Sequence, residues 1–163
     1  MTSPERTPWS NGAPETHIQV RKGKEMIALI LAAGYATRLY PLTINTPKPL
    51  LPVGPKAMID YITDEIETIP DVNKIVVVTN HRFADKFADW ASARSDKDLA
   101  EGRISTPIEV IDDGTTDDTN KLGAIGDIQF VIDKLAIDED MMIIAGDNLF
   151  TYKLKDMYDF FME

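Results

Sequence analysis

Apolar runs of strand length alternate with segments of helical spacing along most of this chain, and this alternation restricts the fold more than any other feature. The run Lys74–Thr79 is continuous and β-branched, as expected for a strand buried on both faces. Between such runs, apolar residues recur three or four positions apart, as they do along one side of a helix. The chain is therefore predicted to form an α/β fold in three layers, with a mostly parallel, Rossmann-like sheet and helices on both faces.

The expected strands and helices can be bounded from this pattern. In one helix, Ile125 is expected on the apolar side together with Val131. Ligands of such sheets bind beyond the carboxyl ends of the strands, so the loops that follow Leu31 and Ala145 are the expected site. Strands are predicted at residues 27–31, 74–79, 107–111 and 141–145, and helices at 58–69, 83–90, 123–135 and 154–161.

Composition argues against several classes of function. The formal net charge of −10 argues against nucleic acid as a partner. The longest apolar run has eight residues, far fewer than the ~20 of a membrane-spanning helix. The chain has no cysteine, and its first 25 residues lack the apolar segment of a signal peptide, so we expect a cytoplasmic protein with no membrane partner. A homo-oligomer is compatible with the sequence, which does not itself indicate an oligomeric state.

Residues 1–25 differ in composition from the rest of the chain. They are rich in Pro, Ser, Thr, Gly and Asn and show no hydrophobic period. Such a segment cannot bury enough apolar surface to fold, so a disordered N-terminal extension is predicted there. One folded domain is expected over residues 26–163.

The stretch Ile30–Leu51 combines a buried strand, a turn of small residues and two cations. A backbone that lies close to phosphate oxygens needs small side chains, and successive N–H groups of such a turn can bind an anion. Arg38 and Lys48 follow the turn, where fixed cations could stabilise charge on a phosphoryl group. The stretch therefore indicates a site for a nucleoside triphosphate. The small residues of the turn are Ala32, Ala33, Gly34 and Ala36.

Three sequence blocks of this region resemble the signature of the sugar-1-phosphate nucleotidyltransferase family, which makes nucleotide sugars. They read LAAGYATRLYPLT from Leu31, PKPLLP from Pro47 and KAMI from Lys56. A fourth block, AGDNLF from Ala145, resembles the metal-binding G-D-N of that family. The resemblance covers residues 26–163. It has two departures, since Ala36 stands where the family usually has glycine and Ala57 where it usually has proline.

The resemblance implies roles for the matching residues. Arg38 and Lys48 would bind the triphosphate and stabilise the transition state, while Asp147 would bind Mg²⁺, which prefers carboxylate oxygen and bridges substrate phosphates. Lys56 is a further candidate, or a residue of a helix start. If Ala36 must adopt a left-handed conformation, backbone strain is expected there. Contacts to the nucleotide are implied for Leu31, Ala32, Ala33, Gly34, Tyr35, Ala36, Thr37, Asn80 and Gly123.

Four further features follow the predicted strands or precede the predicted helix, and two of them, Asn80 and His81, each have two interpretations. Asn80 follows a predicted strand and could reach the base, or it could be a turn residue at the strand end. Gly123 resembles the glycine that lets a nucleobase approach the chain closely. The acidic run Ile111–Asn120 lacks the twelfth-position glutamate of a calcium loop, so a solvated loop beside the nucleotide is expected. His81 is expected in a loop, with or without a minor contact to the site.

The expected reaction is nucleotidyl transfer from a nucleoside triphosphate to a sugar-1-phosphate, with pyrophosphate as the leaving group and Mg²⁺ as cofactor. A phosphocholine-type cytidylyltransferase is one alternative, because that branch shares the LAAG and PK blocks. A non-catalytic nucleotide-binding or regulatory module is another. Relatives run well beyond the length of this chain, and their later half supplies most of the sugar site. The chain is therefore expected to provide the nucleotide-binding part, while the base and the acceptor are not fixed by its sequence.

Overall fold

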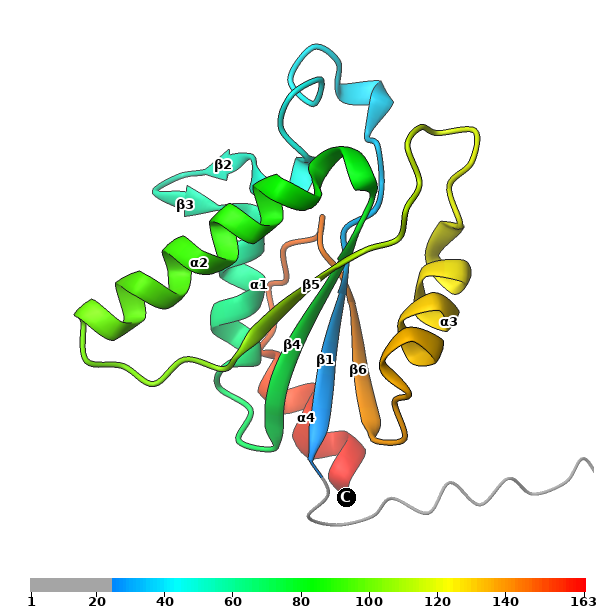
Figure 1. The fold of residues 1–163 in the computed structure, drawn as a ribbon. Helices are drawn as coiled ribbons and strands as arrows, with labels where there is room; N and C mark the ends of the chain where they lie inside the picture. The colour runs from blue at the N-terminus through cyan, green and yellow to red at the C-terminus, as the bar shows by residue number, and fades with distance from the viewer. Residues whose placement is uncertain (1–24) are drawn as a thin grey trace, which may run out of the picture.

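The computed structural model describes residues 25–163, so the predicted N-terminal extension lies outside the described residues except for Glu25. A four-stranded parallel sheet forms the centre of the molecule, in the order β5-β4-β1-β6 (Figure 1). The chain runs outward from β1 to β4 and β5 and then places β6 on the other side of β1. The parallel α/β sheet expected from the sequence is confirmed. The strands are β1 (Met26–Leu31), β4 (Val72–Thr79), β5 (Ile108–Asp112) and β6 (Asp140–Ala145).

Helices cover both faces of this sheet and give the fold three layers (Figure 1). One face carries α1 (Met58–Ile66), α2 (Ala84–Ala100) and α4 (Leu154–Met162). The other face carries α3 (Gly123–Leu135). No helix of residues 25–163 is long and apolar enough to cross a membrane.

The strands divide the core in two, because successive side chains of a strand point to opposite faces. Ala28 and Ile30 of β1 are fully buried in the cluster that contains α1, α2 and α4. Leu29 points to the other face, where it shares a cluster with Val131 of α3. Val76 and Val77 of β4 follow the same alternation. Burial on both faces explains why β4 reads as a continuous apolar run.

Some boundaries and one buried face differ from the sequence prediction. Helix α2 runs to Ala100, ten residues beyond the predicted end. Helix α1 ends at Ile66 rather than near residue 69, and Ile69 is instead buried in the turn that leads to β4. The prediction that Ile125 lies on the apolar side of α3 was wrong, since this side chain is 80% exposed. Asp127 and Val131, four residues apart, occupy the buried face of α3. Ile125 precedes Asp127 by two positions and so points the other way.

The long connection from β1 to α1 contains only short elements. They are the 3-10 turns η1 (Thr37–Leu39) and η2 (Lys48–Leu50), followed by the two-stranded antiparallel ribbon of β2 (Pro52–Val53) and β3 (Lys56–Ala57). A further 3-10 turn, η3 (His81–Phe83), joins β4 to α2. These turns place backbone and polar groups at the carboxyl edge of the sheet.

Arg94 ties α2 to α1 through a nearly buried ion-pair network. Its side chain is 10% exposed, and its guanidinium nitrogens lie 3.5 Å from Asp60, 2.7 Å from Asp64 and 2.8 Å from Glu67. Trp90, one turn earlier in α2, donates its indole N–H to Asp60 Oδ1 at 2.9 Å. These contacts fix the helical layer that supports one face of the sheet.

Candidate functional site

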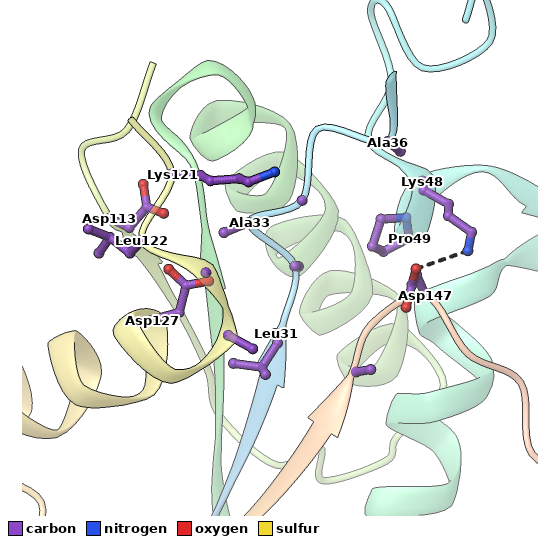
Figure 2. A pocket seen from close by; sticks show the side chains of 15 residues that line it. Leu31, Ala33, Ala36, Lys48, Pro49, Asp113, Lys121, Leu122, Asp127 and Asp147 are labelled. Atoms are coloured by element: carbon purple, nitrogen blue, oxygen red, sulfur yellow. Dashed lines mark hydrogen bonds and ion pairs between the residues drawn. The ribbon is translucent and has the colours of Figure 1, made fainter. Parts of the chain in front are cut away.

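A cavity of about 300 Å³ lies beyond the carboxyl ends of β1 and β6, where the strand order reverses (Figure 2). Ligands of open α/β sheets bind at such a switch point. Leu31 and Ala145, the last residues of the two strands, are paired neighbours. The two loops expected to form the site therefore reach the same cavity. Of the predicted site residues, the cavity is lined by Leu31, Ala32, Ala33, Gly34, Ala36, Lys48, Gly123 and Asp147.

Hydrogen bonds to the sheet hold the loop that follows β1. The N–H of Ala32 donates to Val78 C=O at 2.8 Å, and the N–H of Gly146 donates to Leu31 C=O at 2.9 Å. A Cβ on Gly146 would lie 3.0 Å from that Leu31 oxygen, so the close approach of β6 to β1 requires glycine there. The small residues of the loop are thereby held at the cavity by backbone contacts.

Ala36 adopts the left-handed conformation that its position in the turn requires, with φ +47° and ψ +41°. A residue with a Cβ loses about 1–2 kcal/mol in this region. The carbonyl of Ala36 accepts hydrogen bonds from Thr43 Oγ1 at 2.8 Å and from the N–H of Leu39 at 2.9 Å, which hold the turn. Ala36 is therefore in the left-handed conformation for which the sequence analysis expects backbone strain.

Lys48 and Asp147 meet at the edge of the cavity although 99 residues separate them. Lys48 Nζ donates to Asp147 Oδ2 at 2.9 Å (Figure 2). Lys48 opens η2 between two prolines that restrict its backbone, and Asp147 follows the end of β6. Both side chains remain partly open to solvent, at 30% and 48% exposure. The arrangement sets one cation and one carboxylate beside the small-residue loop.

Three of the predicted nucleotide contacts and the predicted catalytic residue Arg38 do not line the cavity. Asn80 is fully buried, donates its side-chain N–H to Ala33 C=O at 3.0 Å and caps η3, so it supports the loop from behind. Tyr35 is buried as well, and burial raises its pKa. Thr37 and Arg38 lie exposed in η1. No ion pair holds Arg38 within the described part of the chain.

Two other candidates lie away from the cavity. Lys56 forms an ion pair with Asp64, and its ammonium lies 4.0 Å from the centre of the Tyr61 ring. His81 Nδ1 lies 2.6 Å from Asp112 Oδ2, and this hydrogen bond raises the pKa of His81. The exposed His81 is thus part of a surface pair at the ends of β4 and β5.

Two carboxyl groups that the sequence did not single out also line the cavity. Asp113 belongs to the acidic run expected to be solvated, yet it is only 8% exposed, so that expectation was wrong for this residue. Asp127 of α3 is 6% exposed. Burial and then the negative charge of Asp113 raise the pKa of Asp127 to about 6. The spacing of Asp127 and Val131, four apart on one helix face, is the signal that could have found it.

Comparison with known proteins identifies related sequences. The family model described as Nucleotidyl transferase matches residues 27–163. Mannose-1-phosphate guanylyltransferase 1 of Arabidopsis thaliana is 30% identical over 137 residues, which are 83% of this chain and 34% of that protein. N-acetylmuramate alpha-1-phosphate uridylyltransferase of Caulobacter vibrioides is 42% identical over 74 residues, which are 45% of this chain and 30% of that protein.

Solved structures share the fold. A UDP-glucose pyrophosphorylase complexed with UDP-glucose gives a TM-score of 0.63 at 20% identity, over 85% of this chain and 54% of that one. CTP:phosphocholine cytidylyltransferase from Streptococcus pneumoniae gives 0.54 at 25% identity, over 80% of this chain and 48% of that one. The chain thus spans about a third of the length of these curated relatives and about half of these solved chains.

Proposed function

Since the chain belongs to the nucleotidyl transferase family, we propose that it serves nucleotidyl transfer from a nucleoside triphosphate to a sugar-1-phosphate. The observation that carries the proposal is the Lys48–Asp147 pair at the edge of the cavity. A cation and a carboxylate, an oxygen ligand of the kind that Mg²⁺ prefers, beside a loop of small residues suit the phosphates of a nucleotide. The relatives named as guanylyl- and uridylyltransferases support the same reaction class.

In the proposed reaction, a phosphate oxygen of the sugar-1-phosphate forms a bond to the α-phosphorus of the triphosphate. The bond from that phosphorus to the oxygen bridging to the β-phosphate breaks, and its electron pair leaves with pyrophosphate. Such transfer depends on positioning and on charge stabilisation. Lys48 would place its ammonium against the phosphate oxygens. Arg38, exposed and unpaired among residues 25–163, is free to approach the same charge.

Asp147 is the residue that would hold Mg²⁺. Its carboxylate lies at the cavity, is 48% exposed and already accepts a cation, the ammonium of Lys48. Magnesium is commonly held by one or two carboxylates together with waters and substrate phosphates. No cluster of three or more metal-ligating side chains occurs in residues 25–163, which fits a site that the nucleotide completes. Bound Mg²⁺ would neutralise phosphate charge and polarise phosphoryl oxygens.

Pyrophosphate release under single-residue substitution tests the proposal. Lys48→Ala and Arg38→Ala are each expected to lower turnover by ~10²-fold or more, the usual cost of losing one preorganised charge contact. Lys56→Ala is the matched control, because that lysine pairs with Asp64 outside the cavity and should leave turnover unchanged. Near-normal turnover in both Lys48→Ala and Arg38→Ala would refute the assignment.

One alternative acceptor is supported by a specific observation, the similarity to CTP:phosphocholine cytidylyltransferase at 25% identity. Assays should therefore pair each triphosphate with phosphocholine as well as with sugar-1-phosphates. Pyrophosphate release with phosphocholine alone would move the proposal to that acceptor. Tight nucleotide binding with no pyrophosphate release for any acceptor would instead favour a nucleotide-binding module.

A further inference from the structure

Strand β6 forms one edge of the sheet, and no strand of residues 25–163 pairs with its outer side (Figure 1). A cavity of about 160 Å³ lies along this edge, lined by Met142–Ala145 of β6 and by Phe150, Tyr152 and Met157. Tyr152, Met157 and the β6 residue Ile143 are each about half exposed. An open strand edge beside an apolar groove is the kind of surface to which an extended peptide adds as a further strand.

The charges around β6 restrict which strand fits this edge. Asp138, Glu139 and Asp140 are consecutive, and Asp140 opens the strand. Neither Glu139 nor Asp140 forms an ion pair with a lysine or arginine of residues 25–163. Asp147 follows the other end of β6, so an antiparallel second copy of β6 would set acidic ends against each other. The edge therefore favours a strand that is apolar along the groove and basic where β6 begins.

The sequence before β1 contains such a segment. Residues 17–22 read HIQVRK, in which Ile18 and Val20 alternate with polar residues and Arg21 and Lys22 come last. A period of two is that of a strand with one apolar face. These few apolar residues cannot form a core of their own, but the edge of an existing sheet supplies both backbone partners and apolar surface.

We propose that residues 17–22 add to the free edge of β6 as an antiparallel strand. The direction follows from the connection, because Met26 opens β1 and pairs with Asp140 at the start of β6. The segment must therefore end near the start of β6, and residues 23–25 must pass that strand. The distance is two strand spacings, about 10 Å, and the four Cα steps from residue 22 to residue 26 reach at most about 14 Å.

The register follows from the charges and the groove. With Lys22 beside Asp140, Val20 lies opposite Met142, which points to the sheet face that carries α4. Opposite residues of antiparallel strands point to the same face, so Val20 and the isoleucine two positions before it enter the apolar groove. A shift by one residue would turn both away from the groove.

Hydrogen exchange in the full chain, followed by NMR, tests the added strand. The β6 amides that point away from β1 should exchange ~10-fold or more slowly in the wild type than in Val20→Asp, which sets a charge against the apolar groove. Ser10→Asp adds the same charge outside residues 17–22 and should behave as the wild type does. The ratio of exchange in β6 to that in β4 removes any change in global stability. An equal ratio in the wild type and Val20→Asp would overturn the proposal.

Reversal of charge tests the register. Lys22→Glu and Asp140→Lys should each speed exchange of these β6 amides by about 3-fold, the size expected for one exposed ion pair. The double variant should restore the slow exchange. Arg6→Glu makes the same change of charge outside the segment and should have no effect. A double variant that exchanges faster than both single variants would refute the pairing.

A cross-link identifies which molecule supplies the strand. The chain has no cysteine, so Val20→Cys combined with Met142→Cys allows a single disulfide within one chain. Oxidation should give a cross-linked monomer, whereas Ser10→Cys combined with Met142→Cys should stay reduced. A covalent dimer would assign the edge to the segment of a second copy, and no cross-link would leave it to another polypeptide; either result would overturn the proposal. Neither bears on the nucleotide site.

Discussion

The pH dependence of folding stability tests the environment of Asp127. Burial and then the charge of Asp113 raise the pKa of Asp127 from 3.8 to about 6. The folded protein therefore holds this proton more tightly than the unfolded chain does. The resulting stabilisation is fully present below pH 3.8 and is lost as the pH rises through about 6. A shift of about two pKa units corresponds to about 3 kcal/mol, and since Asp127 lines an open cavity, where charges are screened, about 2 kcal/mol is expected.

Asp127→Asn removes the titrating charge and keeps the size of the side chain. The variant should exceed the wild type in free energy of unfolding by about 2 kcal/mol at pH 8 and by almost nothing at pH 4. At pH 8 the melting temperature should rise by ~4–8 °C. Urea unfolding at both pH values measures the difference, with Asp133→Asn as the exposed control at under ~0.5 kcal/mol. An equal difference at both pH values, or a less stable variant at pH 8, would refute the reasoning.

Three further predictions concern the loop, the helical layer and the surface histidine. Ala36→Gly should stabilise the protein by ~1 kcal/mol in chemical unfolding, because it relieves the left-handed strain; a loss of stability would contradict that strain. Arg94→Ala should cost ~3 kcal/mol, since Asp60 and Glu67 lose their cation and Asp64 keeps only Lys56, whereas the exposed Lys97→Ala on the same helix should cost under ~0.5 kcal/mol. NMR titration should give His81 a pKa above 6.5 that falls in Asp112→Asn, and an unchanged value would rule out their pairing.

The fold was largely predictable because its signal is local. Burial on both sheet faces leaves a continuous apolar run such as Ile75–Val78, and amphipathic helices leave a spacing of three or four. Together with the rule for parallel connections, these patterns indicate the layers before any contact is known. The prediction that Ile125 is buried was wrong because it relied on the same local pattern of apolar residues. Apolar character marked it as buried, but the sheet contacts the helix face that carries Asp127 and Val131.

The site was predictable only in part. The small-residue loop, Lys48 and Asp147 could be named because their residue types suit phosphate and metal and lie after strands. The structure brings these three features to one cavity. It gives Asn80 a different place, fully buried behind the loop, where it donates to Ala33 C=O. An asparagine at the end of a strand looks the same in the sequence whether it binds a ligand or caps the backbone.

What the sequence by itself determined is the order of strands and helices and the residue types at the strand ends, since both depend on neighbours along the chain. Only the tertiary structure decided which of these residues meet. It set Lys48 2.9 Å from Asp147 across 99 positions, and it turned Asp113 inward from an acidic loop to lie beside Asp127. Burial and the neighbouring charge then change the pKa of Asp127. Both depend on distances in space, which spacing along the chain does not record.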